Sequence, residues 1–170
     1  MTKQSETPVT KDYFLRPGYI YLPQKPTVIS TVLGSSVSVS LYDKRMKTGG
    51  MNHFLFPYVQ NREKSTALYG NIAVIALIRM MEENGSKRSH LEAQIFGGAF
   101  NTDVSTRDIG KDNFIHARQI LNRKGIKIVS EDVGGSKGRK VVFNTLSYEI
   151  GILKVDRLRM SDWYPYDGDR

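Results

Sequence analysis

Short β-prone segments dominate the chain, and their grouping around two amphipathic segments limits the fold most. The clearest strand follows Gly34-Ser35, where apolar and polar side chains alternate from Val37 to Tyr42. Further strands are expected at residues 18–22, 27–32, 51–56, 91–96, 126–128, 140–143 and 150–155. The order, approximately βββ-α-β-α-βββ, predicts a single α+β domain built in layers. A doubly wound parallel fold would need stricter alternation of strands and helices.

Two segments have the apolar spacing of helices, Thr66 to Asn84 and Asp108 to Lys124, and a glycine follows each of them. We expect the larger apolar side chains to face the core: Leu68, Ile72, Ile75, Leu77, Ile78 and Met81 in the first helix, and Phe114, Ile115, Ile120 and Leu121 in the second.

The length of 170 residues fits one domain, which we expect to span residues 17–160. Residues 1–16 are expected to form a loose polar tail and residues 161–170 a second tail. No run approaches about 20 apolar residues. The N-terminal segment lacks the apolar core of a signal peptide. The sequence therefore predicts a soluble cytoplasmic protein without membrane insertion.

The chain contains no cysteine, which excludes a disulfide framework and thiolate zinc sites. Its three histidines, His53, His90 and His116, do not have the spacing of a metal motif. No phosphate-binding glycine motif occurs either, so we expect neither a metal nor another cofactor.

The formal net charge of +8 permits an acidic partner. The basic residues are scattered in small groups, however, and no zinc-finger or RNA-binding pattern accompanies them. A dedicated nucleic-acid-binding surface is therefore not expected.

The best candidate site combines the Gly34-Ser35-Ser36 break with His53. Each residue also has an ordinary structural interpretation, since turn serines usually bond to their own backbone and a lone histidine in a strand is usually structural. Ser36 does not lie in a GxSxG nucleophile motif, and no acidic residue is an obvious triad carboxylate. The residues alone indicate only a possible site around residues 30–53.

Motifs along nearly the whole chain, from about residue 18 to 157, resemble the chemoreceptor glutamine deamidase family CheD. The matching segments are Leu33-Gly34-Ser35-Ser36, Leu41-Tyr42-Asp43, Gly49-Gly50-Met51-Asn52-His53-Phe54 with Pro57, Tyr69-Gly70, Leu91-Glu92-Ala93, Ile95-Phe96-Gly97-Gly98-Ala99, Ile109-Gly110 with Asn113, Glu131-Asp132-Val133-Gly134-Gly135, Arg139 and Phe143.

The resemblance implies a layered α/β/β sandwich and hydrolysis of glutamine side-chain amides on chemotaxis receptors, without a cofactor. It places the catalytic residues at Ser36, His53 and Ser30. The family's nucleophilic cysteine maps onto Ser36, its histidine onto His53, and a hydroxyl residue six positions before the nucleophile onto Ser30. The implied partners are the cytoplasmic helices of chemoreceptors and a CheC-type chemotaxis phosphatase.

Serine at position 36 leaves two functions open. The chain is either a deamidase or a catalytically silent binding module on the same fold, because binding does not need the thiol. The sequence is equally compatible with a natural loss of the cysteine and with a deliberate cysteine-to-serine exchange.

Overall fold

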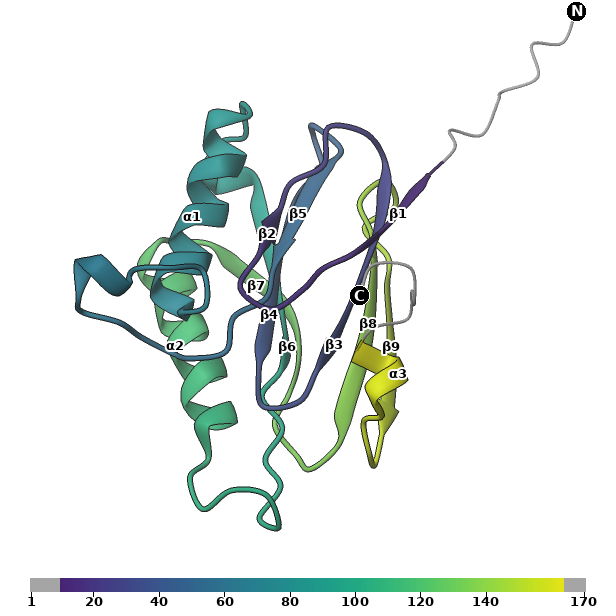
Figure 1. The fold of residues 1–170 in the computed structure, drawn as a ribbon. Coiled ribbons are helices and arrows are strands. Elements are labelled where there is room, and N and C mark those ends of the chain that lie inside the picture. Colours follow the sequence, from purple (N-terminus) through teal and green to yellow (C-terminus); the bar gives the residue numbers. More distant parts are fainter. Residues whose placement is uncertain (1–9, 164–170) are drawn as a thin grey trace, which may run out of the picture.

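The computed structural model describes residues 10–163, in which two β-sheets are stacked and two helices cover one of them (Figure 1). The four-stranded sheet has the order β1 (Lys11–Phe14), β3 (Thr27–Leu33), β8 (Gly138–Asn144), β9 (Ile150–Val155). The five-stranded sheet has the order β2 (Ile20–Tyr21), β5 (Thr48–Asn52), β4 (Val37–Asp43), β6 (Leu91–Gly97), β7 (Lys127–Val133). The pairs β1–β3 and β6–β7 are parallel, and the other pairs are antiparallel.

The helices α1 (Gly70–Glu83) and α2 (Ile109–Arg123) lie side by side on the five-stranded sheet (Figure 1). Short helical segments occur at Arg62–Lys64, Arg88–His90 and α3 (Met160–Trp163). One apolar core lies between the helices and this sheet, and a second core lies between the two sheets. These layers confirm the predicted single α+β domain with an α/β/β arrangement.

Strand β4 supplies side chains to both cores. Val37, Val39 and Leu41 pack in the core beneath the helices, while Tyr42 packs in the core between the sheets. Ser38 and Ser40 are also fully buried. The alternation predicted for this strand is confirmed, but neither of its faces meets water.

Both predicted helices are confirmed, with shorter bounds. α1 begins at Gly70 and not at Thr66, and Asp108 caps α2 by accepting a hydrogen bond from the N–H of Lys111 at 2.9 Å. The predicted inward faces were partly wrong. The small side chains Ala73 and Ala117 are fully buried. Five of the larger ones are only partly buried: Leu68, which precedes α1, and Ile72, Ile75, Phe114 and Ile115. Of these five, Ile75 and Phe114 still pack against the core. Small side chains let the helices approach the sheet closely, and large residues flank that contact.

The expectation of a loose tail up to residue 16 was wrong for residues 11–16. Here β1 pairs with β3, and the Leu15 side chain is completely buried between the sheets. The polar appearance of this segment comes from edge-strand positions that face outward. Residues 1–9 and 164–170 lie outside the described residues, and α3 begins at the predicted domain end. The domain bounds therefore stay a prediction.

The strand predicted at residues 51–56 is β5, which begins earlier, at Thr48, and ends earlier, at Asn52, so that Gly49 and Gly50 are part of it. A Cβ atom on Gly50 would lie 2.8 Å from the Tyr21 carbonyl oxygen and 3.0 Å from a Leu77 methyl carbon. Glycine therefore lets β2 and α1 close on this strand. Within residues 10–163, no helix is both long enough and apolar enough to span a membrane.

Candidate active site

The candidate residues meet where the chain passes from the four-stranded sheet to the five-stranded sheet. Strand β3 ends at Leu33 and β4 begins at Val37, so the turn between them, including Ser36, bridges the two layers. His53 directly follows β5, the neighbour of β4. Its N–H donates to the Tyr19 carbonyl at 3.1 Å, and its own carbonyl accepts from Gly18 N–H at 2.8 Å. The backbone of His53 is therefore fixed on both sides.

Three buried side chains form a continuous hydrogen-bonded row. Ser36 Oγ lies 2.8 Å from Nε2 of His53, and Thr31 Oγ1 lies 2.8 Å from Nδ1 of the same ring. Ser36 is 3% exposed, and His53 and Thr31 are not exposed at all. The structure thus brings together two of the three residues that the resemblance indicated, Ser36 and His53.

The assignment of Ser30 as the hydroxyl partner of His53 was wrong. Successive side chains of a strand point to opposite faces. In β3, Thr31 points between the sheets, whereas Ser30 is only partly buried and lies opposite Val142 of β8. Both ring nitrogens of His53 already have hydroxyl partners, Ser36 and Thr31. The hydroxyl that contacts His53 therefore lies five positions before Ser36, not six.

The hydrogen bonds of Thr31 determine which nitrogen of His53 carries the proton. The Thr31 hydroxyl has a single proton, and the Leu15 carbonyl oxygen at 2.8 Å can only accept it. Thr31 Oγ1 must then accept a hydrogen bond from Nδ1–H. This leaves the lone pair of the neutral ring on Nε2, facing Ser36, and the Ser36 hydroxyl donates to it. That tautomer is the one in which His53 can remove a proton from residue 36.

Burial lowers the pKa of His53 from 6.5 to about 4, and a hydrogen bond involving the Leu15 carbonyl acts in the opposite direction to a smaller extent. No carboxylate among the described residues bonds to the ring. His53 is therefore neutral at neutral pH, and its conjugate acid gives up a proton readily.

The carbonyl groups of the Gly34–Ser36 turn are all bonded to donors within the protein. The carbonyl of Gly34 accepts from Ala99 N–H at 2.9 Å, and that of Ser36 accepts from Gly98 N–H at 2.9 Å. The carbonyl of Ser35 accepts from Asn113 Nδ2 at 3.0 Å. Sequence reasoning gave no role to Thr31 or Asn113. Alternation along β3 could have indicated Thr31, whereas nothing in the sequence connects Asn113 to Ser35.

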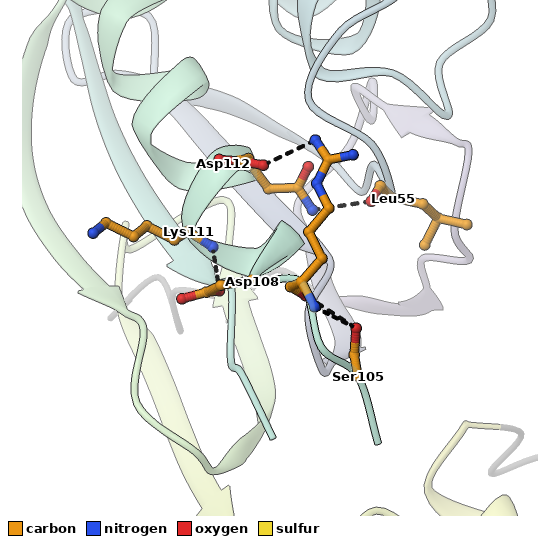
Figure 2. Close-up of polar contacts among 7 residues, drawn as sticks. Leu55, Ser105, Asp108, Lys111 and Asp112 are labelled. Atoms are coloured by element: carbon orange, nitrogen blue, oxygen red, sulfur yellow. Dashed lines mark hydrogen bonds and ion pairs between the residues drawn. The ribbon is translucent and has the colours of Figure 1, made fainter. Parts of the chain in front are cut away.

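A cleft of about 550 Å³ opens beside this turn. Gly34 and Ser35 form part of its wall, together with the loop after β6, the start of α2, the connection between β7 and β8 and the segment after β9. The lining is mainly apolar with a few charged side chains: Ala99, Phe100, Val104, Ile109 and Leu158 together with Arg107, Asp156 and Arg157. Figure 2 shows Asp108 and Asp112 at the start of α2 and Ser105 in the loop before it, near Leu55 of the segment that follows His53. Ser36 itself does not line this cleft, but the two residues that precede it form part of the wall.

The family model described as "CheD chemotactic sensory transduction" matches residues 55–154, more than half of the chain. The chain belongs to the CheD family. Relatives named "Probable chemoreceptor glutamine deamidase CheD" come from Sulfurimonas denitrificans, with 37% identity over 85% of this chain and 94% of the relative, and from Trichlorobacter lovleyi, with 38% identity over 86% and 92%. A relative named "Probable chemoreceptor glutamine deamidase CheD 1", from Anaeromyxobacter dehalogenans, is 40% identical over 77% of this chain and 77% of the relative.

An alignment that covers 85% of a 170-residue chain necessarily includes Thr31, Ser36 and His53. The similarity to CheD proteins therefore extends through the candidate site, although the family model itself begins after His53. The family membership predicted from the sequence motifs is confirmed.

Proposed function

We propose that this chain carries the active site of a protein-glutamine deamidase that acts on chemotaxis receptors. The observation that supports this most is the row Ser36–His53–Thr31, with the lone pair of His53 directed at the hydroxyl of residue 36. It occurs beside a cleft in a CheD chain whose relatives are named chemoreceptor glutamine deamidases. The substrate would be a receptor's cytoplasmic helix, so a cytoplasmic location is part of this proposal.

Acylation begins when the Oγ atom of Ser36 attacks the side-chain carbonyl carbon of glutamine and its proton moves to Nε2 of His53. The carbonyl oxygen becomes an oxyanion, for which the N–H of Ser36 is the candidate donor. The tetrahedral intermediate collapses as His53 returns the proton to the amide nitrogen. Ammonia leaves, and the glutamine carbonyl remains attached to residue 36.

Deacylation repeats these steps with water as the nucleophile. His53 takes a proton from water, the resulting oxygen attacks the acyl carbon, and the proton returns to Oγ of residue 36. The product is a glutamate side chain on the receptor. Thr31 acts through His53 by accepting the hydrogen bond from Nδ1–H, which keeps the ring in the required tautomer and orientation.

Serine makes the first step slow in this site. A cysteine is already a few per cent thiolate at neutral pH, whereas a serine hydroxyl stays protonated and needs a strong base. The pKa of His53 is lowered to about 4 by burial, and a threonine hydroxyl, not a carboxylate, contacts Nδ1. In the part of the chain that the structure describes, no negative charge at Nδ1 stabilises the imidazolium, as the buried aspartate of serine hydrolases does.

The serine at position 36 and the lowered pKa of His53 also favour a second candidate function, a binding module without turnover. Ser36 and the weakly basic His53 would leave the surface around the cleft free to bind a receptor helix or a CheC-type chemotaxis phosphatase. This function requires the fold and the cleft but not the proton transfer.

The exchange Ser36→Cys separates the two functions. Both forms would be incubated with a receptor cytoplasmic fragment, and ammonia release and the glutamine-to-glutamate mass change would be followed. We expect turnover from the Ser36→Cys protein and little or none from the serine form. Equal rates in the two forms would contradict the mechanism, whereas binding without ammonia release from either form would support the binding module.

Ser38→Cys provides a matched control. Ser38 lies in β4, two positions after Ser36, and is also buried. Its hydroxyl has no hydrogen-bond partner among the described residues. A thiol at this position should not produce ammonia release. Activity in the control would show that the thiol acts without the His53 contact.

A further inference from the structure

Asn113 of α2 joins the two segments that carry the proposed nucleophile and base. Its side chain is fully buried, and Nδ2 donates one hydrogen bond to the Ser35 carbonyl at 3.0 Å and one to the Leu55 carbonyl at 2.9 Å. Ser35 precedes Ser36, and Leu55 lies two positions after His53. Both protons of the amide group are therefore used, one on each segment of the site.

The bond to Ser35 fixes the direction of a particular backbone N–H. In a planar trans peptide, the C=O of one residue and the N–H of the next point in opposite directions. Asn113 holds the Ser35 carbonyl toward α2, so the N–H of Ser36 must point away from α2. Among the described residues, none accepts a hydrogen bond from this N–H. It is thus a free donor on the same residue as the Ser36 hydroxyl.

The neighbouring peptides reinforce this orientation. The Gly34 and Ser36 carbonyls accept hydrogen bonds from the N–H groups of Ala99 and Gly98, so all three consecutive carbonyls of the turn are bonded. Two of these three bonds come from the backbone after β6. The one bond that comes from a side chain is that of Asn113, and it belongs to the peptide that contains the N–H of residue 36.

The amide of asparagine suits this position better than other groups of its size. Aspartate has acceptors only and would face two carbonyl oxygens, whereas leucine would leave both carbonyls without a donor. Asn113 Oδ1 is buried and has no hydrogen-bond partner within residues 10–163. An unpaired buried acceptor is unfavourable, so the two donated bonds are the evident reason for an amide here.

Close backbone packing fixes the position from which Asn113 reaches the turn. A Cβ atom on Gly110 would lie 2.5 Å from the Gly98 carbonyl oxygen and 2.6 Å from that of Ala99. The start of α2 therefore rests directly on the backbone that also bonds to Gly34 and Ser36. Figure 2 shows the start of this helix beside Leu55.

We propose that Asn113 is a positioning residue that orients the backbone N–H of residue 36 as the oxyanion donor and holds it in register with His53. The inference rests on the proposed deamidase function for its biological meaning. Its geometry can nevertheless be tested with small reagents and without a receptor.

The test uses the Ser36→Cys protein, alone and combined with Asn113→Ala or Asn113→Asp. Two reactions of the introduced thiol are compared. p-Nitrophenyl acetate is attacked at its carbonyl carbon, forms an oxyanion, and then loses p-nitrophenolate to leave an acetyl thioester. Iodoacetamide loses iodide as the sulfur bonds to its methylene carbon, and no oxyanion forms. The ratio of the acylation rate to the alkylation rate therefore reports the oxyanion donor separately from the thiol itself.

We expect each Asn113 variant to lower this ratio by about tenfold or more, since removal of one oxyanion donor costs on the order of 100-fold or more in rate. Thermal unfolding shows at which temperature each variant is folded, and the rates are compared there. Asn113→Asp keeps the shape of the side chain while removing both donors, and Asn113→Ala removes the amide without adding a charge.

Asn71→Ala is the matched control. Asn71 lies near the start of α1 and also bonds to a loop with its side-chain amide, donating to the Val59 carbonyl at 2.9 Å and accepting from Val59 N–H at 3.1 Å. Its loss should leave the ratio of the two rates unchanged.

Two results would overturn the proposal about Asn113: an unchanged ratio in the folded variants, or an equal fall of both rates, which would indicate a general structural role. A Ser36→Cys protein that p-nitrophenyl acetate acylates no faster than free cysteine would also refute it, because no donor would then be arranged at position 36. Rapid acylation that depends on Asn113, without ammonia release from a receptor fragment, would instead contradict only the proposed function.

Discussion

Acidification should destabilise this protein through the buried ring of His53. Burial lowers the pKa of His53 to about 4 in the folded state, against 6.5 for an exposed histidine. Between these values the unfolded chain binds a proton that the folded protein does not bind, so acid favours unfolding. The contribution is fully present above pH 6.5 and decreases as the pH falls toward 4. The shift corresponds to a loss of about 3 kcal/mol in the free energy of unfolding at the lower limit.

Urea unfolding would measure this loss. The free energy of unfolding would be determined at several pH values from about 7 to about 4 for the unmodified protein and for His53→Gln. Carboxyl groups titrate in both proteins, so the difference between the two curves isolates His53. The unmodified protein should lose stability more steeply, by up to about 1.4 kcal/mol per pH unit.

Parallel curves for the two proteins over this range would refute the reasoning. They would mean that the His53 ring is already charged in the folded protein or can reach water there. In either case, the assignment of a neutral ring with its lone pair on Nε2 would fail.

Two further contacts, Thr31–His53 and Asp132–Arg139, are tested by substitution. Thr31→Val should lower the free energy of unfolding by about 2 kcal/mol, because it leaves the buried Leu15 carbonyl and the Nδ1–H of His53 unpaired. Thr31→Ser and the neighbouring Ser30→Val should each cost less than about 1 kcal/mol. Equal losses from Thr31→Val and Ser30→Val, measured by urea unfolding, would contradict the assignment of Thr31 as the partner of His53. Asp132→Asn should cost about 3 kcal/mol, because Arg139, only 3% exposed, loses its 2.8 Å ion pair. The adjacent Glu131→Gln removes the more exposed ion pair between Glu131 and Arg118 and should cost less than about 1 kcal/mol. Thermal unfolding of the Asp132 and Glu131 variants would show whether this order is correct.

Local sequence patterns predicted the parts of the fold that depend on local spacing. The alternation in β4 and the apolar spacing of α1 and α2 identified these elements and the layered α+β class. The motifs around Ser36 and His53 led to the family and to two members of the buried row. In each case, the signal lies within a short stretch of residues.

The errors concern contacts between distant segments. β1 looked like a polar tail because it is an edge strand, whose stability comes from pairing with β3. Ser30 and Thr31 are adjacent hydroxyl residues, and only the side of the strand that faces His53 distinguishes them. Asn113 lies 78 positions from Ser35, and nothing in its own neighbourhood indicates that its amide bonds to the turn.

The backbone after β6 bonds to two of the places where the chain passes between the sheets. Ala99 N–H donates to Gly34 in the turn before β4, and Phe100 N–H donates to Gly135 in the turn between β7 and β8. The two turns therefore cannot separate independently. The amide hydrogens of Gly98 and Ala99 should therefore exchange with solvent only when the two sheets come apart. The free energy of that opening should be close to the free energy of global unfolding. The proposed nucleophile and base would then lie in a region of the protein that opens last.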